Sequence, residues 1–222
     1  MKLSFVFNQL AGSELKQLAL VDETTGRLRA DKYQTVIDAI NLGLIDLYGR
    51  FLLKIGKVTV PLVEDQEVYN LALIDKKIGA KMIQIHDIRD QHGHVVPYND
   101  FSKPFSVHFT QKTVMHVPKA LIRDHGSKEI ILTYRSMPKQ TAACSPVMDA
   151  DILDVDVDYA YVKALCYFVG SRMHAPVGLQ DATYQPNAFY SMYEAECQRL
   201  EDENFELSYV AYDDKVQRNG WA

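Results

Sequence analysis

The sequence predicts an α+β protein in which helices from both ends of the chain form a helical bundle that carries an inserted antiparallel β wing. Apolar residues recur at helical spacing near both ends, and in the middle they alternate with polar residues between turn-forming segments. We therefore expect a helical bundle at residues 1–55 and 150–205, a β-rich insertion at 56–149 and a C-terminal arm at 206–222.

The strongest helical pattern lies in residues 33–51. Its apolar positions follow steps of three, four and one, which places them on one face of a helix: Tyr33, Val36, Ile37, Ile40, Leu44, Leu47, Tyr48 and Phe51. Asp31 and Gln34 have the spacing of a capping box at the start of this helix. Residues 3–20 indicate one or two shorter helices with a break at Gly12-Ser13.

After Gly56 the apolar period changes to two, which is typical of strands. Polar, Gly-containing corners such as Asp90 to Gly93 suit turns that need a positive φ. We expect a β-meander in this region, closed by a loop at 136–146. Its strands are expected near residues 58–62, 68–73, 82–88, 94–97, 106–110, 113–117 and 129–135.

The C-terminal third predicts two helices joined by a short connector, an antiparallel αα-hairpin. Carboxylates are favoured at a helix N-terminus, so the acidic run from Asp149 to Asp158 is interpreted as the start of the first helix. The second helix is expected from about Pro186. Beyond it, Tyr209, Tyr212 and Trp221 lie among polar residues, a pattern that suits an arm in search of a partner surface.

Composition excludes several classes of protein. Of 222 residues, 47% are hydrophobic and 24% charged, as in folded globular proteins, and a net charge of −5 argues against binding nucleic acid by neutralising phosphates. We expect no membrane segment and no secretion signal, because apolar runs are short and the N-terminal run is interrupted by polar residues. Cys144, Cys166 and Cys197 lie far apart, which suggests neither a disulfide framework nor a cysteine zinc site and fits a reducing compartment.

No motif predicts a catalytic residue, a cofactor site or a metal site. The aspartate run lacks the glycine and glutamate of a calcium loop, and no nucleophile elbow, Walker loop or dinucleotide fingerprint occurs. The histidines lack metal-binding spacing and are interpreted as polar surface positions. The alternative that stays open is a metal-dependent hydrolase built around the strand histidines His86, His108 and His116.

The order of several segments resembles the head-to-tail adaptor proteins of tailed bacteriophages, the head-completion or tubular tail-A family. The resemblance covers most of residues 30–203: a long helix ending in a Tyr-Gly-Arg-Phe sequence, a strand, an acidic-Gly turn with a Val-Pro-Tyr-Asn return, a last strand ending in Tyr-Arg-Ser-Met-Pro, and a closing helix pair. These segments are residues 46–51, 67–71, 82–100, 131–138, 164–172 and 189–200.

The resemblance implies a structural virion protein, not an enzyme, that forms a ring of twelve copies between the capsid portal and the tail. It would lie in the virion neck after assembly in the host cytoplasm, without a cofactor, and contact the portal and a downstream tail or nozzle protein. Double-stranded DNA would pass through during packaging and ejection without specific binding, and negative charge suits this role. A minor tail-tube or host-binding protein of the same virion is an alternative.

Two groups of aromatic residues are candidates for contacts in such a ring. The arm residues Tyr209, Tyr212 and Trp221 would bind the portal, as family members use terminal segments for docking. Four tyrosines flank the helical core stripes and are candidates for contacts between subunits, with an ordinary surface position as the alternative: Tyr48, Tyr161, Tyr167 and Tyr190.

Overall fold

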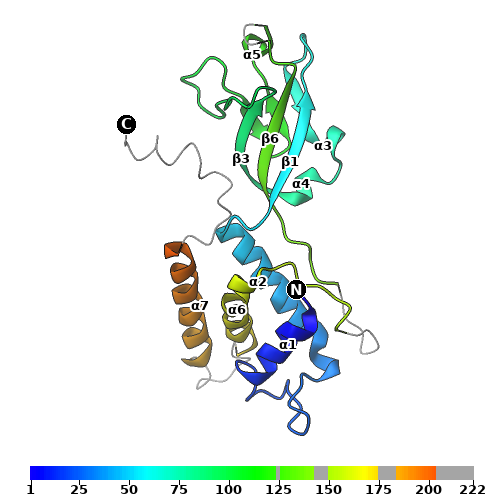
Figure 1. Cartoon of the computed structure of the whole chain (residues 1–222), viewed down its shortest axis with the longest axis vertical. Helices are drawn as coiled ribbons and strands as arrows, with labels where there is room; N and C mark the ends of the chain where they lie inside the picture. Colours follow the sequence, from blue (N-terminus) through cyan, green and yellow to red (C-terminus); the bar gives the residue numbers. More distant parts are fainter. Residues whose placement is uncertain (124–125, 143–149, 175–183, 204–222) are drawn as a thin grey trace. The chain divides into compact units, whose positions relative to one another are not determined.

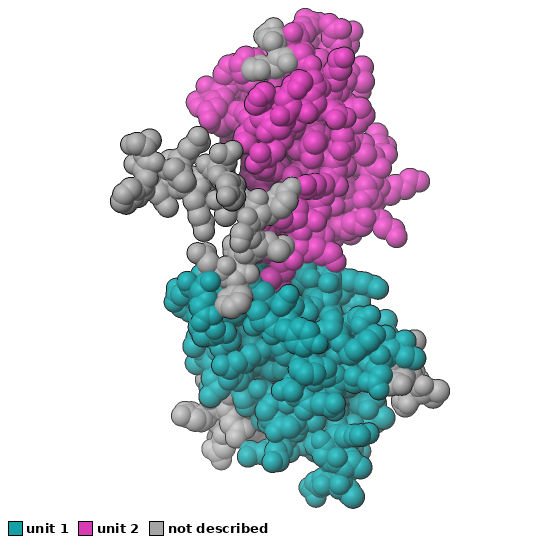
Figure 2. All heavy atoms as spheres, viewed as in Figure 1, with its two compact units in different colours: residues 1–51, 138–222 teal, residues 52–137 magenta. Residues whose placement is uncertain are grey.

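The structure is a computed structural model that describes residues 1–123, 126–142, 150–174 and 184–203. It contains helices and antiparallel sheets, so the predicted α+β class is confirmed. The chain divides into two compact units, Met1–Phe51 with Pro138–Ala222 (unit 1) and Leu52–Met137 (unit 2), drawn in teal and magenta in Figure 2. Unit 2 begins and ends earlier than residues 56–149, the insertion expected from the sequence. Within the described ranges, no helix combines the length and apolar character that a membrane crossing requires.

Unit 1 is helical, and its elements come from both ends of the chain (Figure 1). Helix α6 lies centrally and contacts α1, α2 and α7. Each of these contacts joins segments that are distant in sequence or separated by a connector, so the core of unit 1 closes only when both chain ends are present. The elements are α1 (Leu3–Gly12), η1 (Ala30–Lys32), α2 (Tyr33–Arg50), η2 (Tyr159–Tyr161), α6 (Val162–Met173) and α7 (Tyr184–Asp202).

Close approach between α2 and α6 depends on a glycine. The apolar stripe of α2 is buried, as its spacing predicts, and Gly43 lies on the same buried side. A Cβ added at Gly43 would lie 2.7 Å from Leu165 Cδ1 and 2.9 Å from Phe168 Cδ1. The absence of a side chain at this position therefore lets α6 pack directly against the α2 backbone.

Helices α6 and α7 run antiparallel, as two contacts at opposite ends of the pair show. Near the end of α6, the His174 ring lies 5.0 Å from the Phe189 ring of α7. Near the start of α6, Lys163 Nζ lies 3.0 Å from a carboxylate oxygen of Glu196. Glu196 is buried and also accepts a 2.7 Å hydrogen bond from Arg199, so two cations neutralise this carboxylate at the helix interface.

Two expected helix-start motifs differ from the structure, although the helix expected at residues 33–51 does begin at Tyr33, as α2. Asp31 and Gln34 form no capping box: Asp31 pairs with Arg29 at 3.2 Å, and the Gln34 amide donates to Asp38 at 2.7 Å. Among the described residues of the acidic run, only Asp158 stands at a helix start: it is the N-cap of η2, and its carboxylate accepts a 3.1 Å hydrogen bond from the Ala160 N–H. The side chains of short capping motifs can form many alternative local hydrogen bonds, so the spacing of such a motif alone does not predict that the cap forms.

Unit 2 contains two three-stranded antiparallel sheets. The first has the order β1-β6-β3, and the second the order β2-β5-β4. Their bounds are β1 (Ile55–Pro61), β2 (Val68–Asn70), β3 (Met82–Asp90), β4 (His108–Gln111), β5 (Val114–His116) and β6 (Glu129–Ser136). Short helices connect them: α3 (Leu71–Ile74), α4 (Ile78–Lys81) and α5 (Lys119–Arg123).

The strand order corrects the expected meander. The last strand, β6, lies between β1 and β3, and only β4 and β5 are both adjacent in sequence and paired. Residues 71–73 belong to α3, and residues 94–97 contribute an isolated bridge from Val95 to Arg89 instead of a strand. The turn before them agrees with the sequence, since Gly93 has a φ of +87°.

Candidate functional site

The strand histidines do not form a metal centre in the described part of the chain. His86 lies on β3 of the first sheet, whereas His108 and His116 face each other across β4 and β5 of the second. No group of three or more His, Cys, Asp or Glu side chains among the described residues is arranged to hold a metal ion. Within the described ranges, these histidines are therefore not brought together as the ligand set that the metal-dependent hydrolase considered from the sequence would need.

The turn residue His94 instead contacts the buried carboxylate of Asp90, which has a structural role. Asp90 is buried and accepts 2.8 Å hydrogen bonds from the backbone N–H groups of His92 and His94, and the His94 ring lies 3.1 Å away. Burial acts to raise the pKa of Asp90, but these hydrogen bonds, led by the one from His94, outweigh it and lower the pKa. The arrangement fixes the turn between β3 and Val95.

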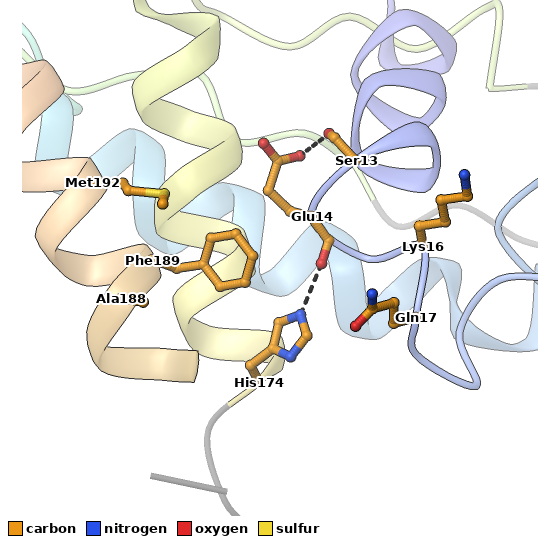
Figure 3. A pocket seen from close by; sticks show the side chains of 8 residues that line it. All are labelled: Ser13, Glu14, Lys16, Gln17, His174, Ala188, Phe189 and Met192. Carbon is orange, nitrogen blue, oxygen red and sulfur yellow. Dashed lines mark hydrogen bonds between the residues drawn. The ribbon is translucent and has the colours of Figure 1, made fainter. Parts of the chain in front are cut away.

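A small pocket of about 260 Å³ lies between the segment after α1 and the start of α7 (Figure 3). It brings together a hydroxyl, an imidazole and a carboxylate, from Ser13, His174 and Glu14. Their bonding is not that of a nucleophile and its base: His174 Nε2 hydrogen-bonds the Glu14 backbone carbonyl at 2.7 Å, while the Ser13 hydroxyl bonds to the Glu14 carboxylate. Phe189 and Met192 add apolar surface to the same pocket.

The more open feature of unit 1 is a groove of about 610 Å³ bounded by α2, α6 and α7. Its floor includes the buried ring of Phe168, and its rim includes Leu42, 53% exposed, and Tyr190, 48% exposed. We call this surface the groove; it is lined by Leu42, Ile45, Asp46, Gly49, Arg50, Phe168, Arg172, Tyr190 and Glu194. Exposed apolar side chains around a depression are typical of protein interaction sites.

Hydrogen bonds between α2 and α7 hold one wall of the groove in place. Arg50 donates to Glu201 at 2.6 Å and to Glu194 at 2.7 Å. The bond to Glu201 is the main reason why the pKa of Arg50 is raised. Tyr193 is buried and donates to Asp46, and burial followed by this bond raises the pKa of Tyr193. The groove therefore has a rigid polar wall beneath an exposed apolar rim.

Two of the four tyrosines expected at subunit contacts lie in the core of unit 1. Tyr48 is buried and donates a 2.8 Å hydrogen bond to the Asp156 carbonyl, and Tyr161 is buried with its ring 5.0 Å from that of Phe51. Their side chains are already covered by their own chain, so we no longer assign them to a subunit contact. Tyr167 is half-buried, and Tyr190 lies at the rim of the groove.

Sequence reasoning missed most of the groove. Leu42 gives a usable signal, because it is an apolar residue outside the buried stripe of α2. Arg172 lies four residues after Phe168 on α6, so their proximity follows from helical spacing, but that both line the groove depends on the packing of three helices. The proposed portal-binding residues Tyr209, Tyr212 and Trp221, like Cys144 and Asp149, lie outside the described residues.

Comparison of the sequence with models of protein families, and with curated proteins, finds no match.

Proposed function

We propose that this chain is a structural subunit of the ring that joins the capsid portal of a tailed bacteriophage to its tail. The observation that carries the proposal is the architecture: a helical unit built from both chain ends, with a β unit inserted between α2 and α6. This is the arrangement that the head-to-tail adaptor resemblance implies. In this role the chain would lie in the virion neck and bind the portal and a downstream tail or nozzle protein.

The surface of unit 1 supports a role in assembly. Six large apolar side chains of its described residues are exposed, and they come from α1, α2, α7 and the segment before α6: Phe5, Leu42, Ile152, Tyr159, Tyr190 and Met192. A ring of identical copies needs two different contact patches on each copy. Exposed apolar groups on several helices can supply such patches.

The charge of the chain is compatible with DNA passing through the ring without being held. The net charge is −5, and like charge repels phosphates. Some carboxylates of the acidic segment have structural roles, since Asp154 pairs with Lys2 at 3.1 Å, yet both side chains remain more than half exposed. If this segment lines the channel, neutralising Asp151 and Asp154 should slow genome ejection from intact particles; unchanged ejection would remove this part of the proposal.

The central test is binding to the portal protein of the same virus. The full chain and the portal would be co-expressed, purified through the portal and imaged by electron microscopy. We expect a ring of added density, of twelve copies, at one end of the portal. A chain truncated after residue 205 is the matched variant, which should remain a folded monomer but lose portal binding. Failure of the folded full-length chain to bind an intact portal would overturn the proposal.

A further inference from the structure

Three exposed apolar side chains gather beside the start of α1. The rings of Phe5 and Tyr159 meet edge to face at 5.7 Å, and Tyr159 is 70% exposed. Ile152, 67% exposed, belongs to the segment whose backbone carbonyls at residues 150 and 153 accept hydrogen bonds from the first turn of α1. We call the surface formed by Phe5, Ile152 and Tyr159 the ridge.

The ridge and the groove belong to different sides of unit 1. They share no residue, and Figure 1 shows α1 and α7 on opposite sides of α6. In a symmetric dimer the same patch of each copy meets itself. A molecule that has one contact patch on each of two sides therefore cannot cover both patches in such a dimer. It can satisfy both in a head-to-tail array, which closes into a ring if the rotation between neighbours permits.

Opposite charges that have no ion-pair partner among the described residues accompany the two surfaces. Next to the ridge, the exposed Asp158 carboxylate accepts a hydrogen bond from the Ala160 N–H, and it forms no ion pair with any described residue. In the groove, the exposed Arg172 guanidinium lies 5.2 Å from the centre of the Phe168 ring, and it too has no ion-pair partner in the described ranges. Each surface thus offers an apolar centre and a charge that the other complements, although the groove also contains the Asp46 carboxylate, which accepts a hydrogen bond from Tyr193.

We infer that the ridge of one copy fills the groove of the next, with Asp158 facing Arg172. The inference rests on the proposed ring function and names the contact that builds the ring. A fully buried aromatic side chain covers about 150–250 Å², whereas a stable interface buries about 800 Å² per partner. The ridge is therefore the apolar centre of a larger contact, whose rim is formed by polar residues around both surfaces.

Disulfide trapping distinguishes this contact from a symmetric one. Tyr159→Cys and Leu42→Cys would be introduced into a Cys144→Ser chain, in which the remaining Cys166 and Cys197 are buried. Under mild oxidation each single variant should stay uncrosslinked, an equal mixture of the two should give a dimer, and the double variant should give a ladder of multimers. A dimer from either single variant would indicate a symmetric interface and overturn the inference.

A control pair and a charge exchange make the test specific. Glu23 is exposed, so Glu23→Cys with Leu42→Cys should give no ladder. Arg172→Glu should weaken self-association about tenfold or more, as expected for loss of a close charge pair, and Asp158→Arg in the same chain should restore it. Circular dichroism would verify the fold of each variant. Loss of association without restoration by the exchange would contradict the Asp158–Arg172 contact.

The outcomes separate this inference from the proposed function. Rings on the portal without a cysteine ladder would overturn the ridge–groove contact and leave the adaptor role intact. A ladder together with failure to bind the portal would support the contact and remove the adaptor role. If neither rings on the portal nor a ladder of multimers forms, both the adaptor role and the ridge–groove contact are overturned.

Discussion

Replacing Gly43 with alanine adds one methyl group where α2 and α6 are closest. The new Cβ would lie 2.7 Å from Leu165 Cδ1 and 2.9 Å from Phe168 Cδ1, both shorter than carbon–carbon contacts tolerate. Leu165 is fully buried, and Phe168 is 4% exposed with its ring beside the Arg172 guanidinium, so neither side chain can move away freely. The helices must therefore separate slightly or the side chains must leave their preferred rotamers.

Two opposing effects set the size of the change. Alanine favours a helix interior by about 1 kcal/mol over glycine, whereas overpacking a core costs about 1–3 kcal/mol. Because two contacts fall below 3.0 Å, we expect a cost in the upper part of that range. The free energy of unfolding of unit 1 should fall by about 1–2 kcal/mol, which lowers Tm by about 2–8 °C.

Gly49 provides a matched control on the same helix. A Cβ added there has no atom within 4 Å, so Gly49→Ala gains helix propensity without overpacking. We expect it to raise Tm by up to about 4 °C. Thermal unfolding followed by circular dichroism at 222 nm, a wavelength that reports helix, would compare both variants with the unsubstituted chain. Equal or higher stability of Gly43→Ala relative to the unsubstituted chain would refute the account of α2–α6 packing.

Three further changes test other parts of the molecule. The hydrogen bond from Arg199 is the main reason why the pKa of Glu196 is lowered, so this carboxylate stabilises the fold above its unfolded pKa, and the contribution is lost as the pH falls through its folded pKa. Glu196→Gln should therefore make the stability measured in urea less dependent on pH between about pH 5 and pH 3. An unchanged pH profile would contradict this role of Glu196. A Cβ at Gly56 would overlap the Tyr134 ring, so Gly56→Ala should destabilise unit 2 by about 1–3 kcal/mol, as measured by urea unfolding. The double variant Gly56→Ala with Tyr134→Leu should recover part of this lost stability. Burial raises the pKa of the Cys166 thiol to about 12, so this thiol should react with a maleimide at neutral pH only after unfolding. Peptide mapping would locate the label, and rapid labelling of Cys166 in the folded chain would be inconsistent with its burial.

Local periodicity predicted the elements that bury one regular face. The stripe through Ile37, Ile40 and Leu44 identified α2 to within one residue at its end, because a helix that covers a core repeats its apolar positions every three or four residues. Alternation similarly located β1, where Val58 and Val60 point to the buried side. These patterns are properties of short segments, so the sequence alone expresses them.

Features that depend on distant partners were not predictable in this way. The local sequences of the strands are compatible with several strand pairings, and a meander, in which successive strands pair, was the simplest of them. The structure instead places β6 between β1 and β3. Tyr48 lies on the predicted stripe, yet its burial depends on a carbonyl 108 residues later, that of Asp156. The groove likewise exists only when α2, α6 and α7 meet, so a single segment such as the one around Leu42 shows one wall at most.

The insertion of unit 2 has a consequence for synthesis on the ribosome. Helices α1 and α2 are made first, but α6, against which both pack, follows only after the whole of unit 2 has been translated. The β unit has all its described strands by Ser136 and can fold while the rest of the chain is still being made. Until then the apolar face of α2 has no permanent cover, so nascent chains stalled before residue 162 should recruit chaperones more strongly than chains released at full length.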